Sequence, residues 1–329
     1  MFSILHSFAS LASFALMLLA FFAMSHGHAA EAYPNRPVRI IVGFPPGGPT
    51  DVVARLAAQQ LTDALGQQVI VDNRPGAGGT LGTTLLTKSA PDGYTLSLAA
   101  NGEIAIAPHL HAKLPYDPTK DLVPISRIGA SQLMLVAHPS LPAKSVSELI
   151  AIAKSRPGGI NFASSGTGST AHLSAELFKV MAKIDIVHVP YKGAGPAMSE
   201  LMGGQVEMLI TGVSAAMPHV KAGKLRGLAS TGGKRLAVAP ELPTIGETVP
   251  GYEVNSWYGI FAPVGTSQPV IDRLHGELAK MVRRPDVKER LDALGIEPEG
   301  TSPAQFAAQV REEILKWAKV VKIAKVSPQ

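Results

Sequence analysis

The sequence predicts an α/β protein, in which the strands of a largely parallel sheet alternate with helices. Three short apolar runs, at residues 38–44, 67–73 and 93–100, have the composition and length of buried strands. Segments with helical periodicity lie between them and begin at about Thr50 and Thr80. Parallel strands need a long crossover connection such as a helix, so this alternation favours parallel pairing.

The residues between about Gln132 and Asn255 predict a second α/β unit with its own core. Ser145 and Glu148 have the spacing of a capping box at the start of its first helix. No low-complexity linker separates the two units, so we expect strands to join them. The expected strands and helices of the second unit alternate at residues 133–139, 144–159, 160–165, 171–182, 185–191, 197–204 and 205–211.

The last part of the chain is expected to return to the first unit. Residues 257–263 have a strand pattern that could rejoin the first sheet. Two amphipathic helices follow at residues 270–282 and 303–321, and Ser302 with Gln305 indicates a cap for the second of them.

Composition excludes several classes of protein. A chain of 329 residues with 46% hydrophobic and 17% charged residues is long enough for two globular domains. Aromatic residues make up only 5%, and the net charge of +5 is scattered rather than clustered, which argues against nucleic-acid binding. The absence of cysteine excludes disulfides, thiol catalysis and cysteine metal sites.

The N-terminal residues predict export. An apolar segment is followed by small residues near Ala29 and Ala30, which is typical of a secretory signal peptide over residues 1–30. The first residues lack the usual Lys or Arg, and an uncleaved membrane anchor is the alternative. We expect the mature protein to be soluble and exported.

A loop with few side chains, "VGFPPGGPTD" at residues 42–51, predicts a first ligand-binding element. Gly47 and Gly48 leave the backbone bare at the start of a helix, where unpaired N–H groups and the helix dipole favour an anion. The alternative is a plain tight turn. Asp51 is expected to cap its own helix or to pair with Arg55 rather than to touch an anion.

A second strand–loop–helix segment, "NFASSGTGSTAHL" at residues 161–173, repeats the construction and adds hydroxyl donors. Its Gly166-x-Gly168-x-x-Ala171 spacing also matches a dinucleotide fingerprint, with Asp185 as the acidic residue, but this match is weak. Each unit therefore has one loop that could bind an anion, which suggests a carboxylate or dicarboxylate held in a cleft.

Several further residues are weaker candidates. Lys192 could add a positive charge to the cleft, and His172 could donate to a ligand or cap its helix. Asn101 and Gly102 follow the third strand, where a turn would face a ligand. The "RPGAGG" loop at residues 74–79 is interpreted as structural.

No catalytic or metal-binding set is visible in the sequence. His109 and His111 have the spacing of a metal pair but lack an obvious third ligand. There is no Gly-x-Ser-x-Gly elbow, and a serine nucleophile in "ASSGTGS" would need a base for which His172 is the only suggestion.

Eight motifs together resemble one family, the periplasmic substrate-binding proteins of tripartite tricarboxylate transporters, also called Bug proteins. They are "YPNRPVRIIVGFPPGGPTD", "VDNRPGAGGTLG", "APDGYTL", "KLPYDPTKDLVPIS", "FASSGTGSTAHLSAELF", "VPYKGAGPA", "PHVKAGKLRGLAST" and "PGYEVNSWYGIFAP". The resemblance covers essentially the whole mature chain. It implies a two-domain periplasmic-binding-protein fold of the Venus-flytrap, type II-like kind, with a ligand cleft between the lobes.

The resemblance also implies domains, partners and location. Residues 31–130 and 256–329 would form domain 1, and residues 131–255 domain 2. The protein would be a periplasmic monomer that binds a small carboxylated solute and delivers it to the membrane components of the transporter. It would need no cofactor, bind no nucleic acid and catalyse no reaction.

The resemblance further implies a set of ligand-binding residues. Many members of the family carry an aspartate after the strand at residues 205–208, where this chain has Ile210-Thr211-Gly212, so the resemblance does not assign an amino acid such as aspartate or glutamate as the ligand. The implied residues are Phe44, Pro46, Gly47, Gly48, Thr50, Asp51, Asn101, Gly102, Ser164, Ser165, Gly166, Thr167, Gly168, Ser169, His172, Lys192, Gly193 and Thr211.

Two alternatives to a transport receptor stay open from the sequence. One is an exported hydrolase or dinucleotide-dependent enzyme that uses the Gly166 loop, which the lack of a catalytic set argues against. The other is a ligand sensor that presents its closed form to a signalling partner, which nothing in the sequence separates from a receptor.

Overall fold

The computed structural model describes residues 33–324 and 326, and the described residues from Arg36 onward form one compact unit. The signal peptide expected at residues 1–30 lies outside the described residues. Within the described part of the chain, no helix is long and apolar enough to cross a membrane.

A single path of strand pairing runs through this unit in the order β2-β1-β3-β9-β4-β7-β5-β6, and β8 and β10 also pair with β4. As the alternation of strands and helices predicts, β1 is parallel to β2 and β3, and β5 is parallel to β6 and β7. The strands are β1 (Val38–Val42), β2 (Val69–Asn73), β3 (Thr95–Ala100), β4 (Leu122–Ala137), β5 (Asn161–Ser164), β6 (Val187–Pro190), β7 (Met208–Gly212), β8 (Arg226–Ser230), β9 (Asn255–Pro263) and β10 (Ile296–Pro298).

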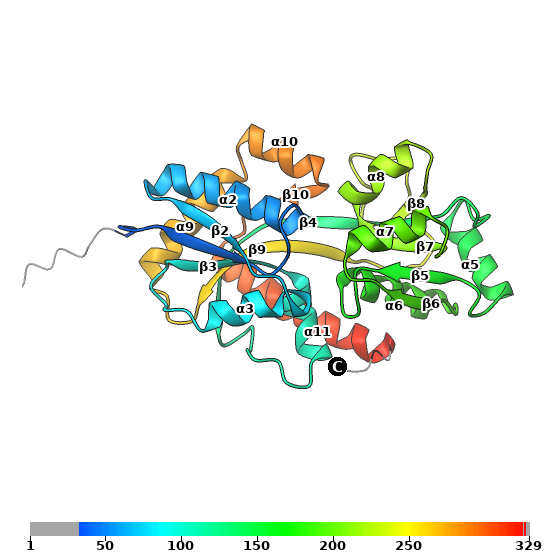
Figure 1. Ribbon diagram of the computed structural model, residues 1–329, viewed down its shortest axis with the longest axis horizontal. Helices are drawn as coiled ribbons and strands as arrows, with labels where there is room; N and C mark the ends of the chain where they lie inside the picture. The colour runs from blue at the N-terminus through cyan, green and yellow to red at the C-terminus, as the bar shows by residue number, and fades with distance from the viewer. Residues whose placement is uncertain (1–32, 325, 327–329) are drawn as a thin grey trace, which may run out of the picture. The chain divides into compact units, whose positions relative to one another are not determined.

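The long strand β4 divides the sheet into two halves. Its residues 122–132 pair with β9 and β10, and its residues 133–137 pair with β7 and β8. We call β1, β2, β3, β9, β10 and the first part of β4 the first half, and the remaining strands the second half. Figure 1 shows β4 and β9 running from the group of β1, β2 and β3 toward the group of β5, β6 and β7. As expected, β9 returns to the first half, antiparallel to both β3 and β4.

Helices cover both faces of each half (Figure 1). Ser145 accepts a hydrogen bond from the Glu148 amide, and Ser302 and Gln305 form reciprocal bonds, so both expected caps are present. The helices are α2 (Pro49–Leu65), α3 (Thr80–Thr87), α4 (Ala107–Leu110), α5 (Val146–Ser155), α6 (Thr170–Ala182), α7 (Ala194–Met202), α8 (Val213–Lys221), α9 (Gln268–Met281), α10 (Pro285–Ala293) and α11 (Pro303–Ala324), with shorter turns η2 (Ala77–Gly79), η3 (Gly102–Ile106) and η4 (Ile245–Glu247).

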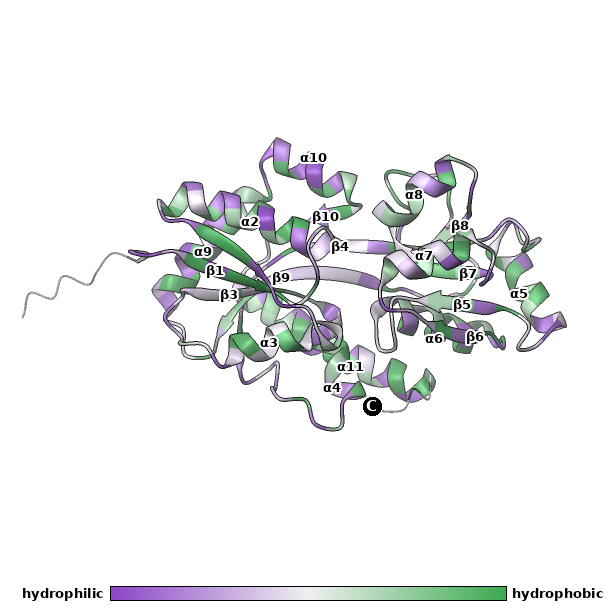
Figure 2. Ribbon diagram, in the orientation of Figure 1, coloured by the Kyte–Doolittle hydropathy of each residue, from purple (hydrophilic) through white to green (hydrophobic). Residues whose placement is uncertain are grey.

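One apolar cluster packs against the second half of the sheet and includes residues from other segments of the chain. It contains Phe162 and Phe178 of the second half together with Ile106 and Trp317, which come from segments assigned to domain 1 by sequence. A smaller aromatic cluster, in which Phe306 packs against Trp257 and Phe261, lies between α11 and β9. Figure 2 shows α10 as largely hydrophilic, whereas four of the five residues of β1 are apolar and buried. The proposed boundary at residues 130 and 131 falls within β4, and the division into two domains stays a prediction.

Candidate functional site

A cavity of about 800 Å³ lies where strands of both halves end and helices begin. Its size is typical of pockets for small ligands. The carboxyl ends of β1, β2, β5, β6 and β7 are followed by α2, α3, α6, α7 and α8. The first residues of α2, α3, α6 and α7 line the cavity, and so does Gly212, the residue that precedes α8. This is the edge at which α/β sheets bind ligands. We call it the helix-end cavity, lined by Phe44, Pro45, Pro46, Gly48, Pro49, Thr50, Ala77, Gly78, Thr80, Ala100, Asn101, Gly102, Glu103, Ala107, Leu110, His111, Leu133, Ser165, Gly166, Thr167, Gly168, Ser169, Thr170, Ala171, Lys192, Gly193, Ala194, Gly195, Pro196, Thr211, Gly212, Ser256 and Tyr258.

The helix ends give the cavity a positive electrostatic character. The first N–H groups of a helix have no partner inside it, and its N-terminus carries roughly half a positive charge. Lys192 adds a full charge from the loop before α7. Among the lining residues that the structure describes, Glu103 is the only carboxylate side chain. The cavity therefore favours an anion.

The loop before α2 is held by Asp51, as the sequence predicts. Its carboxylate pairs with Arg55 at 2.9 Å and also accepts hydrogen bonds from the Gly47 amide and Asn73, both at 3.0 Å. Burial alone would raise the pKa of Asp51, but these hydrogen bonds and the charge of Arg55 lower it overall. The N–H group of Gly47 thus donates to Asp51 and is not free for a ligand, and neither residue lines the cavity.

The loop before α6 is held by two caps. Ser169 accepts a hydrogen bond from the His172 amide, and Nδ1 of His172 accepts one from the Gly168 amide at 3.1 Å. Gly168 has φ +81°, in the left-handed region, and a Cβ atom there would lie 2.7 Å from Leu110 of α4. Only glycine lets this loop pack against α4 without strain. His172 thus positions the loop through these hydrogen bonds, and it does not line the cavity.

A stacked pair of histidines, the buried His172 and the half-buried His188, supports the same loop. The rings of His172 and His188 stack with centroids 3.9 Å apart, and Nε2 of His188 lies 2.6 Å from Oγ of Ser164. Burial lowers the pKa of His172 to about 3, helped by the nearby His188, and burial lowers the pKa of His188 to about 4. Both rings are therefore neutral at ordinary pH. Ser164 is fully buried, so it acts in this support rather than on a ligand.

Asn101 connects the two halves. Its Oδ1 accepts hydrogen bonds from Thr170 of α6, at 3.2 Å, and from Ser256 of β9, at 3.1 Å. Its Nδ2 donates to the backbone oxygen of Asn255 at 3.3 Å. Asn101 lines the cavity, but most of its hydrogen-bonding capacity is used within the protein.

All the residues that the sequence implies for the site line the helix-end cavity except Gly47, Asp51, Ser164 and His172. Their contact with a ligand stays a prediction. His109, by contrast, bonds the backbone oxygen of Ile314, and residues 33–324 and 326 contain no group of three side chains suited to a metal.

Sequence reasoning missed several residues of the site. Ala77 and Gly78, in the loop interpreted as structural, line the cavity, as does the buried Glu103. A glycine-rich loop after a strand was a sufficient signal for Ala77 and Gly78. Nothing in the local sequence indicated that Glu103 lies in the wall.

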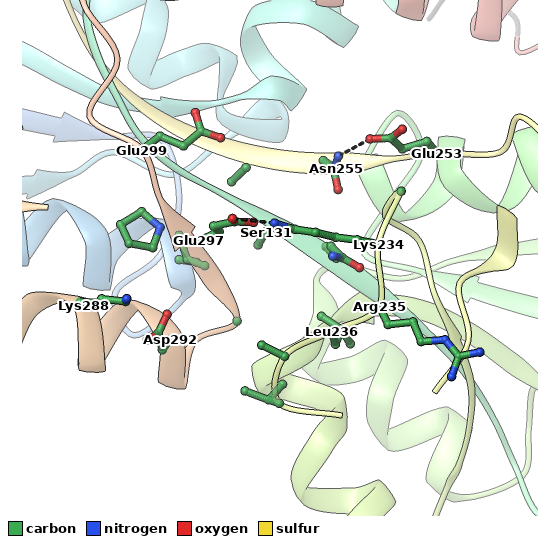
Figure 3. A pocket seen from close by; sticks show the side chains of 18 of the residues that line it. Ser131, Lys234, Arg235, Leu236, Glu253, Asn255, Lys288, Asp292, Glu297 and Glu299 are labelled. Carbon is green, nitrogen blue, oxygen red and sulfur yellow. Dashed lines mark hydrogen bonds and ion pairs between the residues drawn. The ribbon is translucent and has the colours of Figure 1, made fainter. Parts of the chain in front are cut away.

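A second cavity, of about 940 Å³, touches the same two long strands. Asn255 of β9 lines it, whereas the adjacent Ser256 lines the helix-end cavity; because successive side chains of a strand point to opposite faces, the two cavities lie on opposite faces of β9. Figure 3 shows Lys234 extending toward Glu297, with which it pairs at 2.7 Å. We call this cavity the charged groove, lined by Arg127, Ala130, Ser131, Gln132, Gly233, Lys234, Arg235, Leu236, Ala237, Val238, Glu253, Asn255, Lys288, Asp292, Gly295, Ile296, Glu297, Pro298 and Glu299.

Comparison with known proteins identifies the family. The family model described as "TctC: Tripartite tricarboxylate transporter family receptor" matches residues 53–326. The chain is also similar to the solved structure of R. palustris Rpa4515 with adipate, with 38% identity, a TM-score of 0.84, and coverage of 90% of this chain and 100% of that one.

Two further solved structures are similar. The periplasmic binding protein BugD has 35% identity and a TM-score of 0.81, with 90% of this chain and 100% of that chain covered. MatC from Rhodopseudomonas palustris with bound malate has 36% identity and a TM-score of 0.79, with 88% and 100% covered. The fold is therefore the α/β periplasmic-binding-protein fold, as the motifs imply.

This family consists of solute receptors rather than enzymes, so a hydrolase or a dinucleotide-dependent enzyme is not supported. The match spans most of the chain and agrees with the motifs at the helix-end cavity. The chain belongs to the tripartite tricarboxylate transporter receptor (TctC, or Bug) family.

Proposed function

We propose that this receptor is exported to the periplasm, binds a small dicarboxylate in the helix-end cavity and delivers it to the membrane components of its transporter. The observation that carries this proposal is the convergence of five helix N-termini and Lys192 on one cavity of about 800 Å³. The adipate and malate bound to two similar structures support a dicarboxylate. The apolar N-terminal segment, and the description of BugD as periplasmic, support export.

Binding in this proposal depends on closure of two lobes. Residues 31–130 and 256–329 form one lobe and residues 131–255 the other, joined by β4 and β9, which are the strands that touch both cavities. Closure excludes water from the helix-end cavity, which strengthens the attraction between the helix ends and the ligand carboxylates. The protein acts as a monomer, because the ligand is enclosed by one chain.

Calorimetric titration and thermal-shift measurements on the exported protein test the proposal. The panel contains adipate, malate, a tricarboxylate, a monocarboxylate, an amino acid and NAD. We expect at least one dicarboxylate to bind with a Kd in the micromolar range or below, and to raise Tm by several degrees at saturating concentration. A response to NAD alone would overturn the proposal.

A further inference from the structure

Glu103 is the one feature of the helix-end cavity that an anion receptor does not obviously need. Its side chain is 1% exposed, and it lies in the wall of the cavity among helix ends that favour negative charge. None of the ion pairs of the described residues includes it. A carboxylate in that position would repel the ligand proposed above, so its protonation state decides what it contributes.

The two oxygens of Glu103 have different surroundings. Oε1 accepts a hydrogen bond from the Ala100 amide at 2.8 Å. Oε2 is buried and has no hydrogen-bond partner in the described part of the chain. Buried polar atoms are nearly always paired, so an unpaired one calls for a partner that the protein itself does not supply.

The groups that face Glu103 do not neutralise a negative charge. Tyr116 donates its O–H group to the Glu103 backbone oxygen, and Tyr258 lies near the carboxyl; burial and the proximity of Glu103 both raise the pKa of each tyrosine. Gly79 packs so closely that a Cβ atom there would lie 3.1 Å from Glu103 Cδ. Burial raises the pKa of Glu103 to about 8, against the opposing effect of backbone N–H groups. The carboxyl is therefore neutral near pH 7.

We propose that Glu103 stays protonated in the loaded receptor and donates a hydrogen bond from Oε2 to a ligand carboxylate, directly or through one water. Oε1 already accepts a bond from Ala100, which leaves Oε2 as the atom that carries the proton. The hydrogen of this O–H group turns about the Cδ–Oε2 bond, so it can be directed to a ligand while Oε1 keeps its bond to Ala100. Glu103 is thus a specificity-determining residue that selects an acceptor and rejects an amino group.

This inference rests on the proposed function and adds that ligand binding is coupled to protonation of Glu103. Binding of the carboxylate keeps Glu103 protonated, so raising the pH above its pKa must weaken binding. With a pKa of about 8 in the empty receptor, affinity at pH 9 should be roughly tenfold lower than at pH 7. Near pH 8 each ligand bound should take up about half a proton.

The experiment is calorimetric titration with adipate or malate between pH 6 and 9.5, in buffers of different ionisation enthalpy. We expect wild type to lose affinity above pH 8 and to take up protons, and Glu103→Gln to bind with little pH dependence. The control variant is Glu299→Gln. Glu299 lines the charged groove, and burial raises its pKa as well, so this variant should keep the wild-type dependence of affinity on pH. His111→Gln is measured as well, because His111 lines the same cavity, and it should keep the loss above pH 8.

Four results would overturn the inference. Binding by wild type with no proton uptake and no loss above pH 8 would leave the proposed function standing and remove Glu103 from it. An unchanged pH profile in Glu103→Gln would assign Glu103 a structural role only. Binding of an amino-bearing ligand in preference to dicarboxylates would mean that Glu103 is ionised. If Glu103→Gln does not fold, proton uptake by wild type decides the question, and a wild type that binds no carboxylate at any pH would refute the proposed function as well.

Discussion

The helix-end cavity and the charged groove lie on opposite faces of β9, and they differ in size and in how their charged side chains are paired. The groove, at about 940 Å³, is the larger of the two, and four of its charged side chains form two ion pairs with one another. Lys234 pairs with Glu297, and Arg127 with Glu299. In the helix-end cavity, at about 800 Å³, Lys192 and Glu103 form no ion pair among the described residues. We therefore place the ligand by the charges and helix ends that line a cavity and not by its volume.

The largest effect is expected from filling the helix-end cavity at Gly48. Its φ of −80° suits any residue, and the nearest atom to an added Cβ is the Pro45 oxygen at 3.9 Å. Gly48→Phe should therefore keep the fold and weaken dicarboxylate binding by more than about 100-fold, because the ring occupies the space of the ligand. Calorimetric titration measures the affinity, and a thermal melt checks the fold.

The matched control for this variant is Ala237→Phe, which places the same ring in the charged groove. It should leave the affinity within about twofold of wild type. If Ala237→Phe abolished binding and Gly48→Phe did not, the roles given to the two cavities would have to be exchanged.

A smaller effect is expected from removing one lysine from each cavity. Lys192→Gln should weaken dicarboxylate binding by about tenfold at low salt, because a charge-assisted contact of an exposed lysine that lines the cavity contributes roughly 1–1.5 kcal/mol. Lys234→Gln should change it by less than about twofold, because Lys234 belongs to an exposed pair with Glu297. Titration at two salt concentrations checks both, and equal losses in the two variants would show that only net charge matters.

The smallest effect is expected on stability in mild acid. The pKa of His172 and of His188 is lower in the folded protein than the usual 6.5, so the unfolded chain takes up protons first as the pH falls. Stability is complete above about pH 6.5 and declines as the pH falls toward 4. His188→Phe keeps the ring stack but removes one of these groups, so Tm between pH 6.5 and 5 should fall by roughly 3 °C less than in wild type. Thermal melts across this range measure the slope, and an unchanged slope would contradict the assignment.

Much of the fold was predictable because its signals are local. The apolar run of β1, the glycine-rich loop, and the Asp51–Arg55 spacing at the start of α2 are each visible within a few residues, and the structure confirms them. The first part of β4 was missed, because Pro124 and Gly129 interrupt its pattern. The helix α10 was missed because it has few apolar residues.

The site was predictable to the extent that it consists of strand ends followed by helices. The loops at Gly48 and Gly168 follow that rule, and both line the helix-end cavity. The stack of His188 on His172, and the burial of Glu103 against Gly79, depend on segments far apart in the chain. Side-chain contacts of that kind arise from tertiary packing, which periodicity and spacing do not encode.

The five helix ends at the cavity have a consequence for how such receptors diversify. Their anion-attracting groups belong to the main chain, and no amino-acid substitution deletes a peptide N–H group except one to proline. Descendants of this chain can therefore exchange the surrounding side chains freely and still attract acids. New ligand preferences would arise from side-chain changes that alter the shape of the cavity, while the backbone N–H groups at the helix ends stay the same.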